Sequence, residues 1–556
     1  MLKRLFPFIG WRFSKEDVRA DFFAGLTVAL VLIPQAMAYA QLAGLPVVVG
    51  LYAACIPVAI GALWGSSHHL QTGPVAMTSL LTGTVLLPLA VPETADYIAL
   101  AGLLAVMIGC IRLFVGLSRL TVLANFLSKP VIDGFVHAGV LVIASSQVSK
   151  LVGLELHTGG WYLRNLWDLL CRVGDINWSA AVVGGAAILA LVLLKRFLPR
   201  WPASLLVVAG STLVVYLFGL HDPERVAVPL SVVGHIPGGL PKLVSIHFEW
   251  ENILKMLPGA FVITFIGFME MCGVAKAVAA KSRQPLNLNQ EIIGQGLAAL
   301  SSGFTGGYSV SGSLSRTALN YSSGAKSGLS ALFTGTFVAL FLLFFARTIY
   351  CLPKATLGSI IIVAVVKLLD FKRLFGYWKV SRLEGSVAII TFAATLLFAP
   401  QLQNGILMGA GLAIMIFLFQ TMKPNVSLLG RHDDGSYRSH NIHGLEIDPQ
   451  RPVVRFDGRL FFGNTSYFEA IVLDARGEYP DAKVIIIDCQ GINSIDASGV
   501  AAIENLVFNL RVEGTTLYFA HMKHPVSAVL KKCGLYETIG EDHFFHRLDD
   551  IPRAII

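Results

Sequence analysis

The sequence is poor in charged residues. Only 14% of its 556 residues are Asp, Glu, Lys or Arg, and 54% are apolar, whereas soluble domains carry about 25% charged residues. This deficit excludes a wholly soluble protein. The charges that are present are sparse up to about residue 425 and frequent after it, which indicates a membrane domain followed by a soluble domain.

Motifs for nucleotide-driven or metal-dependent chemistry are missing. The seven cysteines form no CxxC pair, and the histidines do not cluster with the spacing of metal ligands. No glycine-rich phosphate loop of the Walker type occurs, so ATP does not drive this protein directly. We therefore expect no enzyme, no metal and no cofactor. The net charge of +8 needs no nucleic-acid partner, because Lys and Arg collect in short loops as positive-inside topology requires.

The N-terminus lacks an apolar run long enough for a cleaved signal peptide. Residues 1–20 are basic and aromatic instead, which predicts an amphipathic lead-in at the cytoplasmic membrane surface. Residues 21–425 hold apolar runs of membrane-spanning length, and we expect about 14 helices there. The positions of Lys and Arg between the helices place both termini in the cytoplasm, in a multi-pass protein of a bacterial inner membrane.

The C-terminal part alternates short strands with helices. We expect a linker over 426–449 and a small α/β domain over 450–556. Within it, Asp496-Ala-Ser-Gly499 leads into a helix, and either Asp496 or Ser498 would cap that helix. A regulatory role for Ser498, by phosphorylation or ligand binding, is the alternative.

The most unusual stretch of the membrane domain is 309–327, which is rich in hydroxyl groups. Its single arginine, Arg316, lies among serines and small residues, and such a segment is tolerated at membrane depth only when it faces protein or a water-filled cavity. We interpret it as the floor of an anion site, built from a helix N-terminus and one cation. Residues 72–76 in the first half have a similar composition, which indicates an inverted repeat whose broken helices meet at the midplane.

Three further side chains fit this site. Gln35 and Tyr39 follow Pro34 at a spacing of four residues, so both project from one face of a kinked helix. The alternative is a polar pair that joins helices. Glu270 is a lone acid in an apolar helix, where the neutral form of the carboxyl is favoured and can carry a proton. The alternative for Glu270 is a fixed counter-ion to Arg316 or Lys276, which would equally make Arg316 a structural residue.

Several short motifs carry a family resemblance. They are Ile-Pro-Gln-Ala-Met-Ala-Tyr at 33–39, Thr-Gly-Pro-Val-Ala at 72–76, Gly267–Glu270, Asn289–Glu291, Gly294–Gly296, Ser313–Arg316 and Asp496–Gly499. Together they resemble the SulP family of anion permeases with a C-terminal STAS domain. The resemblance implies a polytopic α-helical membrane protein of two inverted seven-helix repeats, divided into a core and a gate, that works by an elevator motion and usually as a homodimer.

The resemblance also implies the position of the substrate. In the family the anion lies between the N-termini of helices three and ten, with the polar face of the first helix above it. The corresponding residues here are Gln35, Tyr39, Val75, Ala76, Leu314, Ser315 and Arg316. Sodium-coupled members have Asp and, four residues later, Thr where this chain has Glu270 and Val274, so the resemblance favours proton coupling.

We therefore predict a proton-coupled sulfate importer that contacts membrane lipid and has a possible regulatory protein bound to its STAS domain. Transport of bicarbonate or a dicarboxylate, an anion channel or exchanger, and a membrane-tethered sensor that signals through the STAS domain are the alternatives.

Overall fold

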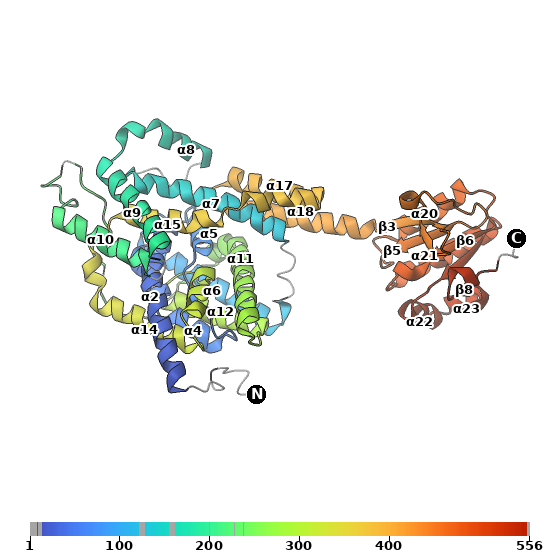
Figure 1. Ribbon diagram of the computed structural model, residues 1–556, viewed down its shortest axis with the longest axis horizontal. Coiled ribbons are helices and arrows are strands. Elements are labelled where there is room, and N and C mark those ends of the chain that lie inside the picture. The colour runs from blue at the N-terminus through green and yellow to red at the C-terminus, as the bar shows by residue number, and fades with distance from the viewer. Residues whose placement is uncertain are drawn as a thin grey trace. The chain divides into compact units, whose positions relative to one another are not determined.

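The computed structural model describes Phe8 and residues 14–121, 128–154, 162–198, 201–226, 228–236 and 238–552. Most of the lead-in expected over 1–20 therefore lies outside the described residues. The chain forms two compact units, Met1–Ala413 and Ile414–Ile556 (Figure 1).

The first unit is helical, because a helix satisfies its own backbone hydrogen bonds where water is absent. Its helices are α2 (Lys15–Leu42), α3 (Val47–Ala53), α4 (Ile56–Trp64), α5 (Ala76–Leu86), α6 (Ala95–Leu117), α7 (Lys129–Leu151), α8 (Tyr162–Cys171), α9 (Trp178–Phe197), α10 (Ala203–Phe218), α11 (Trp250–Ser282), α12 (Leu288–Phe304), α13 (Leu314–Ser322), α14 (Leu329–Phe344), α15 (Lys354–Val365), α16 (Phe371–Val380), α17 (Arg382–Phe398) and α18 (Leu402–Met422), within which the division between the units falls.

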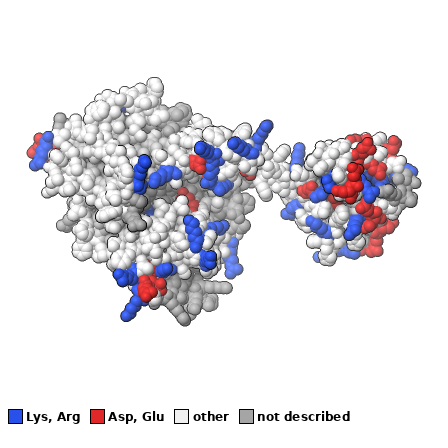
Figure 2. Space-filling view, viewed as in Figure 1, with Lys and Arg blue, Asp and Glu red and all other residues white. Residues whose placement is uncertain are grey.

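Many of these helices can span a membrane. Among the described residues, seven helical segments are long and apolar enough: α2, α3 with α4, α6, α7, α9, α11 and α18; α5, α10 and α14 are shorter apolar helices. On the visible face of this unit, charged residues are few and scattered, and most are Lys or Arg, whereas the C-terminal unit is densely charged (Figure 2). The protein is a multi-pass membrane protein.

The helices of the first unit pack into two bundles. In the first bundle, α2 packs against α3, α5, α13 and α14, while α12 packs against α4 and α6, and α11 against α5 and α6. In the second bundle, α7 packs against α9, α15, α16 and α17. The two bundles meet where α2 contacts α10 and α15, and where α5 contacts α7. This arrangement puts α2 and α5 at the seam between the bundles.

A short antiparallel ribbon crosses the middle of the first bundle. Strand β1 (Thr72–Gly73) pairs with β2 (Ser311–Gly312), so that Thr72 lies opposite Gly312 and Gly73 opposite Ser311. Each strand leads into a short helix, β1 into α5 and β2 into α13. The ribbon thus joins two polar stretches that lie far apart in the sequence, since Thr72 pairs with Gly312. The pairing satisfies backbone N–H and C=O groups that would otherwise lack a partner inside a membrane protein.

Pro74 lies between the ribbon and the helix that follows it. Helix α5 begins at Ala76 with Val75 as its N-cap, and the Pro74 carbonyl accepts a hydrogen bond from Arg316.

The C-terminal unit contains a six-stranded sheet in the order β4-β3-β5-β6-β7-β8. The strands are β3 (Asn425–Arg431), β4 (Tyr437–Ser439), β5 (Val453–Asp457), β6 (Val484–Asp488), β7 (Thr516–Ala520) and β8 (Phe544–Phe545), and the helices are α19 (His440–His443), α20 (Thr465–Glu478), α21 (Ala497–Val512), α22 (His524–Lys532) and α23 (Leu535–Ile539). Strands β5 to β8 are parallel, and β3 is antiparallel to both of its neighbours.

Both faces of this sheet are covered. Alternate residues of a strand point to opposite faces, so Ile485 and Ile487 of β6 join the larger core with residues of α20, α21 and α22, while Val484 and Ile486 join a smaller core on the other face. Residues 426–449, expected as a linker, hold most of β3 together with β4 and α19, and so form part of the sheet. The stretch after β5 leads through a turn into α20.

Candidate functional site

The candidate site lies where α5 and α13 begin. The first N–H groups of a helix have no acceptor within the helix, and together with the helix dipole they favour an anion. The N-cap of α5 is Val75, whose side chain cannot accept a hydrogen bond, and the N-cap of α13 is Ser313. The β1–β2 ribbon brings these two helix starts into one place.

Arg316 lies between the two helix starts. Its side chain is 1% exposed. Its Nη1 donates to the Pro74 carbonyl at 2.9 Å and to Gln35 Oε1 at 3.3 Å. Its Nε and Nη2 are buried and find no partner among the described residues. A guanidinium with two free donors in a buried position is suited to hold a bidentate oxyanion.

The predicted structural alternative for Arg316 is not seen. Within the part of the chain that the structure describes, no ion pair joins Arg316 to Glu270. Arg316 is held by the neutral acceptors Pro74 and Gln35 instead, so its positive charge is not neutralised by a salt bridge there.

The first helix contributes the polar face that the sequence predicts. Gln35 is half-buried and bonded to Arg316, and Tyr39 is 7% exposed. Glu270 lies on α11, which packs against α5 and α13. It is half-buried and makes no ion pair among the described residues.

The remaining predicted residues differ in exposure. Val75 and Ala76 are 8% and 9% exposed, so their contribution to a site comes from backbone groups. Leu314 is 60% exposed and Ser315 is also exposed. The first turn of α13 therefore has exposed side chains at Leu314 and Ser315 and a buried one at Arg316, whereas the start of α5 is buried.

The structure adds a residue that sequence reasoning missed. Tyr308 is fully buried just before β2, and its hydroxyl lies 2.8 Å from Ser79 Oγ on α5. In the sequence, Tyr308 is one aromatic residue in the glycine-rich stretch 305–309. That pattern does not predict its contact with Ser79.

The start of α21 is a separate polar feature in the C-terminal unit. The Asp496 side chain accepts from Gly499 N at 2.9 Å and from Phe462 N at 3.0 Å. Partial burial alone would raise the pKa of Asp496, but the backbone donors Gly499, Phe462 and Ser498 outweigh it and lower that pKa. Asp496 is the N-cap, and Ser498 is exposed in the first turn.

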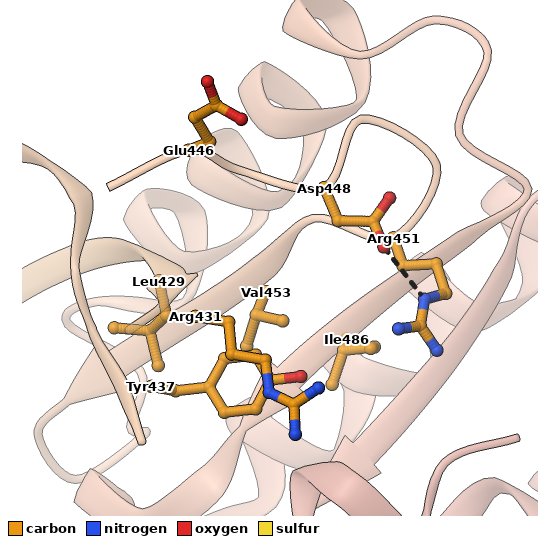
Figure 3. A pocket seen from close by; sticks show the side chains of 8 residues that line it. All are labelled: Leu429, Arg431, Tyr437, Glu446, Asp448, Arg451, Val453 and Ile486. Carbon is orange, nitrogen blue, oxygen red and sulfur yellow. Dashed lines mark hydrogen bonds and ion pairs between the residues drawn. The ribbon is translucent and has the colours of Figure 1, made fainter. Parts of the chain in front are cut away.

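The C-terminal unit also contains a cavity of about 320 Å³ (Figure 3). Its floor is apolar, from Leu429, Val453 and Ile486, and its rim carries Arg431, Tyr437, Glu446, Asp448 and Arg451. Arg451 pairs with Asp448 at 3.3 Å and Arg431 with Asp549 at 3.2 Å. Both cations are therefore neutralised, which distinguishes this cavity from the site around Arg316.

Two family models match the chain. Residues 18–391 match the sulfate permease family, and residues 445–551 match the STAS domain. The second match lies in the unit with the six-stranded sheet.

Curated relatives align over nearly the whole chain. The chain is 32% identical to the chloroplastic sulfate transporter 4.1 of Arabidopsis thaliana, over 99% of this chain and 82% of the relative. It is 31% identical to a probable sulfate transporter of Mycobacterium tuberculosis, over 98% and 96%. It is 30% identical to the sodium-independent sulfate anion transporter of Bos taurus, over 96% and 89%. These relatives are transporters rather than enzymes.

Solved structures share the fold. The murine solute carrier 26 family member A9 anion transporter in its inward-facing state superposes with a TM-score of 0.90 at 23% identity, covering 99% of this chain and 93% of that one. The transmembrane domain of the cyanobacterial bicarbonate transporter BicA superposes with a TM-score of 0.61 at 22% identity, covering 72% and 99%.

Proposed function

Because the chain belongs to the sulfate permease family, we propose that it is a secondary active transporter that takes up sulfate together with protons. The observation that carries the proposal is the environment of Arg316. One buried guanidinium with two free donor atoms lies between the N-termini of α5 and α13. The guanidinium and both helix N-termini favour a small oxyanion. The names of the relatives support sulfate as the substrate.

The motion that we propose is an elevator. The site belongs to the first bundle, since α2, α5, α11 and α13 pack together there. The second bundle contributes the facing helices α7, α10 and α15. Movement of the first bundle as a rigid body against the second would carry the anion across the membrane without dismantling the ribbon.

Glu270 is the residue that we propose for proton coupling. Burying a divalent anion is costly unless its charge is compensated. A proton on Glu270 would remove one negative charge from the neighbourhood of the anion during the crossing. Val274, in place of the threonine of sodium-coupled members, supports protons rather than sodium as the coupling ion.

In the cell, we propose a homodimer in a bacterial inner membrane with both termini in the cytoplasm. The STAS domain would then be available to a cytoplasmic regulatory protein, with Ser498 exposed at the start of α21 as the candidate contact or modification site.

Uptake by purified protein in liposomes tests this proposal. Labelled sulfate, bicarbonate and fumarate are offered in turn, with and without imposed proton and sodium gradients. We expect saturable sulfate uptake that is driven by an inward proton gradient and unaffected by sodium. Uptake of bicarbonate or fumarate alone would contradict the substrate, sodium-driven uptake would contradict the coupling, and unitary currents in planar bilayers would indicate a channel.

A further inference from the structure

A second buried arginine lies in the first bundle. Arg112 of α6 is 1% exposed. Its Nη1 donates to the Val310 carbonyl at 2.7 Å, while its Nε and Nη2 are buried without a partner in the described ranges. No acidic group of the described residues lies within ion-pair distance of it.

The surroundings of Arg112 are shaped for a guanidinium. A Cβ atom on Gly267 of α11 would lie 2.6 Å from Nη2, so a side chain at that position would displace the guanidinium. The adjacent Ser311 Oγ donates to the Gly267 carbonyl at 3.0 Å. An unpaired charge inside a membrane protein is costly, and an apolar side chain would fill the space at lower cost. Packing alone therefore does not account for an arginine here.

Arg112 and Arg316 both touch the same ribbon. Val310, which Arg112 binds, directly precedes β2, and Ser311 of β2 pairs with Gly73 of β1. A Cβ atom on Gly73 would lie 3.3 Å from Arg316 Nη2. Arg112 thus holds the strand that leads into α13, and it adds an unneutralised positive charge close to the site.

We propose that Arg112 is a positioning residue that also makes the site selective for divalent over monovalent anions. The proposal rests on the anion transport proposed above. Coulomb energy is proportional to the product of the two charges, so a fixed charge stabilises a divalent anion by about twice the free energy that a monovalent anion gains. The effect on the dissociation constant of a divalent anion is then the square of the effect on a monovalent one.

Binding of sulfate and of nitrate to the purified full-length protein tests this proposal. In Arg112→Met, we expect the loss of charge to weaken sulfate binding about tenfold and nitrate binding about threefold. The loss of positioning lowers both affinities by a further common factor, so the ratio of the two affinities should change about threefold. Arg112→Lys, which keeps the charge, should restore the ratio of the two affinities. Arg119→Met, an exposed substitution at the end of the same helix, is the matched control and should change neither affinity.

Gly267→Ala separates the positioning role of Arg112 from its electrostatic role. It also serves as a second variant if Arg112→Met fails to fold. The added methyl group displaces the guanidinium but keeps its charge, so both affinities should fall by the same factor. Equal losses in Arg112→Met, or no loss, would overturn the electrostatic role. A wild-type protein that binds neither anion would refute the proposed function itself, and this inference with it.

Discussion

At the scale of single residues, Arg316 supplies the charge of the candidate site. Hydrogen bonds to a charged group contribute roughly 1.5–3 kcal/mol each, and two donors of Arg316 are free. We expect Arg316→Ala to weaken sulfate binding by at least about 100-fold. Arg316→Lys should recover only part of the affinity, because an ammonium group lacks the planar fork.

Calorimetric titration of the detergent-solubilised protein measures this effect. Arg283→Met, an exposed arginine at the end of α11, is the control and should bind sulfate normally. Unchanged binding in Arg316→Ala would remove Arg316 from the site.

A substitution of Glu270 tests the coupling of sulfate uptake to protons rather than the binding of sulfate. Gln has nearly the same shape as a protonated Glu but cannot release a proton. We expect Glu270→Gln to abolish the response of sulfate uptake to an imposed proton gradient, while sulfate–sulfate exchange persists. Glu251→Gln, an exposed substitution on the same helix in an ion pair with Lys255, should leave the response intact. A proton response that survives in Glu270→Gln would exclude this carboxyl as the coupling group.

At the scale of elements, the β1–β2 ribbon sets the distance between the two helix starts. Gly73 has a φ of +146°, which an L side chain rarely adopts, and an added Cβ would press on Arg316 Nη2. We expect Gly73→Ala to weaken sulfate binding about tenfold, through a strain of roughly 1 kcal/mol or more. Gly185→Ala on α9, where a Cβ meets nothing within 4 Å, is the control. Equal affinities in the two variants would show that the ribbon does not position Arg316.

In the C-terminal unit, which has its own core, the element that we test is the N-cap of α21. We expect Asp496→Ala to lower the free energy of unfolding of this unit by about 1 kcal/mol, measured by urea denaturation of a fragment from residue 424 onward. Because the pKa of Asp496 is lowered in the fold, its contribution is complete above the unfolded value of about 4. It is lost as the pH falls through the lower folded value.

The wild type and Asp496→Ala should therefore converge in acid. Ser498→Ala keeps the N-cap and should unfold like the wild type. A stability loss in Ser498→Ala that matches Asp496→Ala would assign Ser498 a structural rather than a regulatory part.

At the scale of the whole membrane unit, a hydrogen bond crosses the seam where α2 and α5 meet the second bundle. Lys150 Nζ of α7 donates to the Gln41 carbonyl at 3.2 Å, at the C-terminal end of α2, where a cation also complements the helix dipole. An elevator motion must break this bond in every cycle. We expect Lys150→Met to favour conformations in which this end of the seam is open.

The measurement is the rate at which a membrane-impermeant maleimide labels Gln41→Cys, a substitution that keeps the backbone carbonyl. Lys150→Met should increase this rate several-fold, whereas Lys255→Met, which breaks only an exposed ion pair within α11, should not. Equal labelling rates would show that the Lys150 contact does not hold the seam closed.

The sequence by itself determined the membrane class, the C-terminal STAS domain and the two polar stretches around Gly73 and Arg316. These features follow from local composition and short motifs. Long apolar runs are long enough to span a membrane as helices, and an arginine within the membrane is costly unless it faces the protein interior or a water-filled cavity. The pattern also predicted that Gln35 and Tyr39 share a face, because the period of a helix requires it.

Only the tertiary structure decided how these parts meet. It showed that Arg316 bonds to Pro74 and Gln35 rather than to Glu270, that residues 426–449 hold strands of the sheet, and that Tyr308 reaches Ser79. In the sequence, Arg112 is a cation within an apolar run, and only the fold shows it without an ion pair beside the ribbon. The physical reason is common to all of these: contacts between segments hundreds of residues apart depend on how the helices pack, which local periodicity does not specify.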